Sequence, residues 1–127
     1  MKPYESITVC GCEYHLKITA ANAVKLEEQL GTDPLSGIEK LAEIKTLAKY
    51  YFAAAVSLND SIKTIDDIYQ LFDDYIIEGG TYDTLQRLVI DILLTSGILT
   101  QEGYDMTKKA EGKQKQLMEE ALQKLLP

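Results

Sequence analysis

Residues 10–15, with the sequence CGCEYH, hold both cysteines and the only histidine of the chain, so they are the first candidates for metal or thiol chemistry. A closed zinc site needs four ligands, and a carboxylate or a second chain would have to complete the three found here. Cysteine–histidine catalysis needs the two groups within hydrogen-bond reach and a third group that orients them. The segment therefore predicts a structural turn, with a metal site or a redox-sensitive thiol as the alternatives.

The residues around this segment alternate between apolar and polar, as a two-stranded ribbon with one buried face requires. A two-residue turn at Gly11 and Cys12 fits, because glycine tolerates the positive φ that such turns demand, and it pairs Val9 with Tyr14. In this register His15 lies beside a threonine and has no nucleophile next to it. The expected buried face holds Ile7, Val9, Tyr14, Leu16 and Ile18, and the wetter face holds Ser6, Thr8, His15 and Lys17.

A second set of candidates is the run of acids in DDIYQLFDDYIIE, residues 66–78, which suggests a divalent cation or an acid–base pair. Calcium loops take their ligands from closely spaced, non-helical positions, whereas these acids lie two turns apart on an expected helix. A solvated acidic face is the prediction. Neither of the glycine-rich phosphate-binding patterns occurs in the chain. We therefore expect no catalytic residue, no metal site and no cofactor, and so no enzyme.

The composition limits the class of partner. The chain has 127 residues, of which 46% are hydrophobic, enough for one compact domain. Its net charge of −7 repels phosphate backbones and anionic lipid, so we expect neither nucleic acid nor membrane as partner. No apolar run approaches the roughly 20 residues that cross a bilayer, and the N-terminus lacks the layout of a signal peptide. A soluble, intracellular protein is the expectation.

Hydrophobic periodicity predicts an α+β, mainly α fold in which the β-hairpin precedes a compact body of four to five helices. Helices are expected at 20–30, 38–58, 64–78 and 81–97. The second is the best candidate for a central helix, because Ala53 and Ala54 flank its apolar stripe and permit close packing. The last of these helices has an apolar face wider than one stripe, so it should either be central in the core or be covered on a second side by another element. Thr19 and Thr64 are the expected N-caps, and Gly31, Gly79, Gly80 and Gly97 the expected stops.

We treat residues 1–127 as a single domain with three parts: the hairpin at 1–19, the helical body at 20–100, and a tail at 101–127. The tail begins as a polar, lysine-rich spacer and ends in an amphipathic helix. Such an end can dock on its own core, on another copy or on a different protein.

Aromatic and apolar side chains supply the candidate partner surface. Several tyrosines sit on or beside apolar helix faces, where they either pack in the core with the hydroxyl at its rim or line a groove for a partner's helix. The second alternative would also explain the wide apolar face of the last helix. The candidate partner-binding residues are Tyr51, Phe52, Leu88 and Ile92 in the body and Leu117, Leu122 and Leu125 in the tail.

In the order of its segments, the chain resembles the tail assembly chaperones of long-tailed bacteriophages and prophages. The segments that carry the resemblance are YHLKIT, AANAVKLEEQLG, PLSG and LLTSGIL, between residues 14 and 99. The resemblance implies a protein without enzymatic activity that binds the tape measure protein, keeps it soluble and helps to recruit tail tube protein. It also implies a place in the cytoplasm of the bacterial host and absence from the finished virion.

A different class of function stays open. The chain would also suit a non-enzymatic adaptor or regulatory subunit that forms a homo-oligomer through its apolar helix face. A second copy would then cover that face completely, whereas a chaperone leaves it available for exchange.

Overall fold

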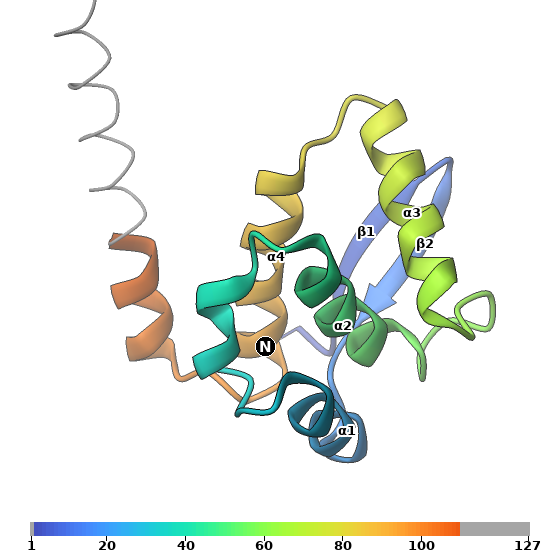
Figure 1. The fold of residues 1–127 in the computed structure, drawn as a ribbon. Coiled ribbons are helices and arrows are strands. Elements are labelled where there is room, and N and C mark those ends of the chain that lie inside the picture. The colour runs from blue at the N-terminus through green and yellow to red at the C-terminus, as the bar shows by residue number, and fades with distance from the viewer. Residues whose placement is uncertain (1, 110–127) are drawn as a thin grey trace, which may run out of the picture.

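The computed structural model describes residues 2–109, in which a two-stranded hairpin precedes a group of helices (Figure 1). This confirms the expected α+β, mainly α class. Residues 101–109 are also helical, although we expected a polar spacer there. The elements are β1 (Glu5–Val9), β2 (Cys12–Leu16), α1 (Ala20–Leu30), the 3₁₀ turn η1 (Ser36–Lys40), α2 (Ile44–Ala55), α3 (Ile65–Ile77) and α4 (Tyr82–Thr95).

The hairpin turn differs from the expected one. It lies at Cys10 and Gly11, which both have positive φ, and it pairs Val9 with Cys12, so the predicted register is wrong by two residues. A positive φ is unusual for cysteine, but the Cys10 N–H donates to Glu78 Oε1 at 2.6 Å, which helps to hold the turn. Because a shift of two preserves the alternation of a strand, the expected faces are nevertheless right.

Helix α2 forms the centre of the body, as expected, and packs against α1, α3, α4 and β2. It begins at Ile44, later than the predicted start at residue 38, because residues 36–40 form a separate 3₁₀ turn. The Asp33 carboxylate accepts hydrogen bonds from Ser36, and these bonds hold the pKa of Asp33 below its usual value. The buried residues of α2 are Thr46, Leu47, Ala48, Tyr50, Tyr51, Ala53, Ala54 and Ala55.

The expected helix caps are confirmed. The Thr19 hydroxyl accepts from the Asn22 N–H at the start of α1. Thr64 and Asp67 form a capping box at α3, where the Asp67 carboxylate accepts from the Thr64 N–H at 2.9 Å. Hydrogen bonds from the Lys63 and Thr64 backbones lower the pKa of Asp67. These caps fix where each helix begins relative to the loop before it.

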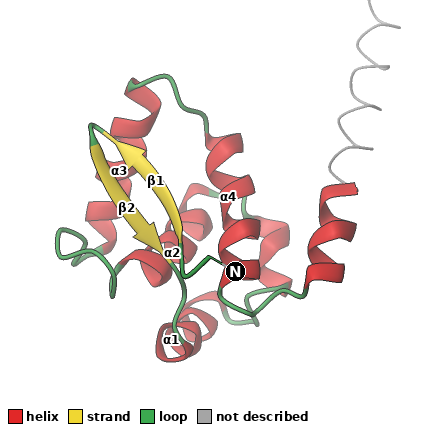
Figure 2. Ribbon diagram, turned by 180° about the vertical axis from the view of Figure 1, so that it is seen from behind, coloured by secondary structure: helices red, strands yellow, loops and turns green. Residues whose placement is uncertain are grey.

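The hairpin lies against the helices (Figure 2), which supply the stability that an isolated ribbon lacks. The side-chain amide of Asn59 accepts from the His15 N–H at 3.0 Å and donates to the His15 carbonyl at 2.7 Å. It thereby closes the outer edge of β2 as a neighbouring strand would. A second tie links Lys17 N–H to the Ala54 carbonyl at 3.0 Å, so β2 is fastened to the end of α2.

Within residues 2–109, no helix combines the length and the apolar character needed to cross a bilayer.

Replacing Asn59 with Ala should lower the free energy of unfolding by about 1–3 kcal/mol, because it leaves both backbone groups of His15 without their partner. Urea denaturation followed by circular dichroism measures this loss. The matched control is Asp60→Ala at the exposed neighbouring position, which should change stability by no more than about 0.5 kcal/mol. Equal effects of the two substitutions would contradict this role of Asn59.

Candidate functional site

The residues that suggested thiol or metal chemistry, Cys10, Cys12 and His15, belong to the hairpin and make contacts that stabilise the fold. Cys10 and Cys12 are free and exposed, and the His15 ring stacks on Tyr4 with centroids 4.0 Å apart. A hydrogen bond between the Cys10 thiol and the Glu78 carboxylate raises the pKa of this thiol, which disfavours the reactive thiolate. Within residues 2–109, no group of three or more His, Cys, Asp or Glu side chains is placed to hold a metal ion.

The acids of α3 take part in local contacts. Asp67 belongs to the capping box, and Asp74 accepts from the Gln70 side-chain amide at 3.0 Å. Glu78, just after the helix, holds the hairpin turn through Cys10. These three carboxylates therefore have roles in the fold, and they do not converge on a common point.

The prediction that Tyr51 and Ile92 belong to an available apolar face is wrong. Tyr51 is 0% exposed and Ile92 is 1% exposed, so both are part of the core. The Tyr51 hydroxyl donates to the Leu85 carbonyl at 2.7 Å, and burial raises the pKa of this hydroxyl. Phe52 and Leu88 are partly exposed and remain candidates. The other predicted residues, Leu117, Leu122 and Leu125, lie outside the described residues.

The wide apolar face of α4 is covered from within the chain. Helix α4 contacts both α2 and β1, and the helical residues 101–109 lie beside it (Figure 1). The Tyr104 hydroxyl donates to Asp91 Oδ1 at 2.7 Å, which joins this last segment to α4. This arrangement agrees with the second of the two expected alternatives, in which another element covers α4, and it removes most of α4 from the candidate surface.

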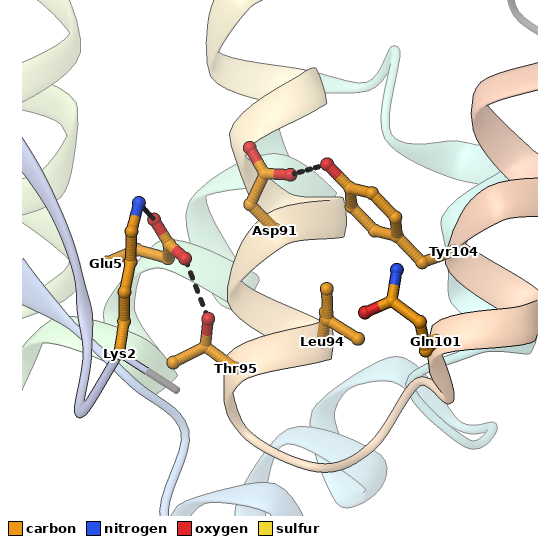
Figure 3. A pocket seen from close by; sticks show the side chains of 7 residues that line it. All are labelled: Lys2, Glu5, Asp91, Leu94, Thr95, Gln101 and Tyr104. Carbon is orange, nitrogen blue, oxygen red and sulfur yellow. Dashed lines mark hydrogen bonds and ion pairs between the residues drawn. The ribbon is translucent and has the colours of Figure 1, made fainter.

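Figure 3 shows a hollow of about 480 Å³ between the N-terminal residues, α4 and the 101–109 segment. Its polar groups largely pair with one another: Thr95 donates to Glu5 Oε1 at 2.7 Å, and Lys2 lies 3.6 Å from the same carboxylate. Asp91 and Tyr104 form the second pair. These contacts join elements of the chain, so we interpret this hollow as a junction between elements of the fold.

A second hollow, of about 400 Å³, has the character of a docking site, and we call it the α2–α3 hollow. Its apolar lining comes from Phe52 on α2 and from Ile65 and Tyr69 on α3, and the lining residues of each helix lie about one turn apart. Its polar lining includes no acid. The lining residues are Gln29 at the end of α1, Lys45, Lys49 and Phe52 on α2, and Ile65 and Tyr69 on α3.

A smaller hollow of about 190 Å³ adjoins the α2–α3 hollow and shares Lys45 and Lys49 with it. Lys40 also lines the smaller hollow, and we call these three residues the lysine ridge. The acid in this lining, Glu43, accepts a hydrogen bond from the Thr46 hydroxyl at 3.0 Å. The ridge therefore places positive charge beside an apolar depression on a protein that is acidic as a whole.

Sequence reasoning found Phe52 but missed its partners in the hollow. These partners include Ile65 and Tyr69 of α3, which are only partly buried. The lysines carried a signal, since Lys45, Lys49 and Phe52 follow the i, i+4, i+7 spacing of one helix face. The pairing of this face with the start of α3 depends on the turn between the helices, which no periodicity encodes.

The two alanine substitutions Phe52→Ala and Ile92→Ala test whether Ile92 belongs to the core and Phe52 to the accessible surface. Ile92→Ala should lower the free energy of unfolding by about 2–5 kcal/mol, because it opens a cavity in the core. Phe52→Ala should cost at least about 1 kcal/mol less, because water already reaches this ring. Chemical denaturation of both variants measures the difference. A loss at Phe52 as large as that at Ile92 would place Phe52 in the core.

The functional interpretation rests on this geometry and on the resemblance noted in the sequence. Comparison with protein-family models, with curated proteins and with solved structures finds no match to the chain.

Proposed function

We propose that this chain is a tail assembly chaperone of a long-tailed bacteriophage or prophage, which binds the tape measure protein and keeps it soluble until the tail is built. It acts in the cytoplasm of the bacterial host, helps to recruit tail tube protein, and is absent from the finished virion. The resemblance of the sequence supports this family, and the accessible α2–α3 hollow supports a binding role. The hollow is the observation that carries the proposal.

A chaperone of this kind needs an apolar surface that is available without unfolding. The buried polar side chains of the body are satisfied, since no buried side-chain nitrogen or oxygen in residues 2–109 lacks a hydrogen-bond partner. The apolar side chains of Phe52, Ile65 and Tyr69 nevertheless stay within reach of a ligand. A folded body with an open apolar hollow can therefore hold a client and release it again.

The hollow suits an amphipathic helix. A volume of about 400 Å³ accommodates a few large side chains, such as those that one helix presents at i, i+3 and i+4. Stable interfaces bury roughly 1,200–2,000 Å² in total, more than one hollow of this size provides. Each contact is therefore weak and exchangeable, and a long helical client gains solubility by engaging several chaperone molecules.

A second function has its own observation. Ile76 and Ile77, at the end of α3, are 36% and 81% exposed and directly precede Glu78, which holds the hairpin turn. Large aliphatic side chains at this exposure favour contact with another protein surface, and a second copy of the chain would supply one. This observation favours the self-associating adaptor.

Co-expression with the long, helix-rich protein encoded just downstream in the same genome tests the chaperone function. The unaltered chain should raise the soluble fraction of that client several-fold and co-purify with it. Phe52→Asp should lose both effects, because the charge enters the apolar part of the hollow. The matched control is Val24→Asp, at a position 55% exposed on α1 and outside the hollow, which should rescue the client normally.

Circular dichroism melting of each variant verifies that it is folded, and Phe52→Ala replaces Phe52→Asp if the charged variant is not. No rescue by the unaltered chain would contradict the chaperone function. A closed oligomer that Ile77→Asp dissociates would instead establish the adaptor.

A further inference from the structure

The α2–α3 hollow differs in charge from the rest of the molecule. The whole chain carries a net charge of −7, yet the side chains that line this hollow include two lysines and no acid. Lys40 extends the positive charge into the adjoining hollow. The local field at the hollow therefore favours a negatively charged ligand, although the protein as a whole repels one.

The lysine charges at this site are not neutralised by the described part of the chain. The ion pairs within residues 2–109 belong to Lys2, His15, Arg87 and Lys108, and none involves the lysine ridge. Lys49 Nζ donates to the Gln29 carbonyl at 3.1 Å, which places its ammonium at the C-terminal end of α1 but leaves its other protons available. An anionic ligand can thus bind here without breaking an existing ion pair.

The spacing of these charges matches a helical ligand. Lys45 and Lys49 are separated by one turn of α2, a rise of about 6 Å along the helix axis. Carboxylates at positions i and i+4 of a second helix have the same separation, so both can pair when that helix lies along α2. Phe52 continues the row by one further turn, where an apolar side chain of the ligand can enter.

We infer that the α2–α3 hollow selects amphipathic helices in which large apolar residues are flanked by acids one turn apart, with Lys45 and Lys49 as the residues that recognise the acids. This inference rests on the proposed function, because it takes the hollow to be the site that holds the client. It adds the chemical class of the client segment. A free anion fits less well, since it gains nothing from Phe52, Ile65 and Tyr69.

Three synthetic 18-residue helical peptides test the inference. They share one pattern of leucines at i, i+3, i+4 and i+7 and carry Glu, Gln or Lys beside the leucine stripe. Fluorescence anisotropy with the full chain at low salt should give the tightest binding for the Glu peptide, about tenfold tighter than for the Lys peptide. At about 0.5 M NaCl this preference should fall to within about twofold, because salt screens exposed charge pairs.

Variants of the protein assign the preference to the two lysines. Lys45→Glu/Lys49→Glu should reverse the order of the Glu and Lys peptides, and Lys45→Gln/Lys49→Gln should abolish the difference. The matched control is Lys2→Glu/Lys109→Glu, which makes the same change in net charge outside the hollow and should keep the original order. Lys45 is exposed in the first turn of α2, where a glutamate is well tolerated.

The outcomes separate this inference from the proposed function. Equal binding of the three peptides, lost in Phe52→Asp, would overturn the charge selectivity and leave the hollow as a site for helices. A preference for Glu that survives the double substitution of Lys45 and Lys49 would also overturn it. Failure of all three peptides to bind would overturn the hollow as a helix site, and the co-expression assay would then decide the chaperone function alone.

Discussion

The burial of α2 is the constraint on which the rest of the structure depends. Two adjacent tyrosines of this helix, Tyr50 and Tyr51, are 0% exposed, and a buried phenol without a hydrogen-bond acceptor is costly. Tyr50 donates to the Pro34 carbonyl and Tyr51 to the Leu85 carbonyl, on two different neighbours of α2. Meeting both requirements fixes the loop before η1 and the start of α4 around the central helix.

The same constraint explains the glycine in η1. A Cβ atom at Gly37 would collide with the Tyr50 hydroxyl, so a larger residue there would displace the phenol from Pro34. The Tyr51 ring meets Phe72 edge to face at 5.1 Å, and Phe72 meets Tyr82 in the same way at 6.1 Å. These aromatic contacts thus connect α2 to α3, and α3 to the start of α4.

The candidate site is a consequence of how α2 is buried. Its core-facing side is taken by Tyr51 and the alanines, which leaves Lys45, Lys49 and Phe52 at the margin between α1 and α3. Helix α1 meets this margin with the polar end of Gln29, so the apolar side chains there are only partly covered. The hollow is therefore produced by the packing that stabilises the fold, and its charge comes from two surface lysines.

The sequence predicted those features that depend on periodicity and on local capping. The faces of the hairpin and the N-caps Thr19 and Thr64 belong to this class. The hairpin register does not belong to it, because a shift of two residues leaves both faces unchanged. A contact that helps to hold the observed turn comes from Glu78, 68 residues away from Cys10. Periodicity also shows which face of a helix is apolar but not what covers it, which is why Ile92 was assigned to the surface.

The proposed binding mode places a client helix in the α2–α3 hollow. Amide chemical shifts of the uniformly labelled full chain, recorded with and without a soluble helical fragment of the client, would locate the bound helix. The largest changes in chemical shift should fall within residues 45–52 and 65–69, with little change in α4. Shifts confined to residues 82–109, or to Ile76 and Ile77, would contradict it.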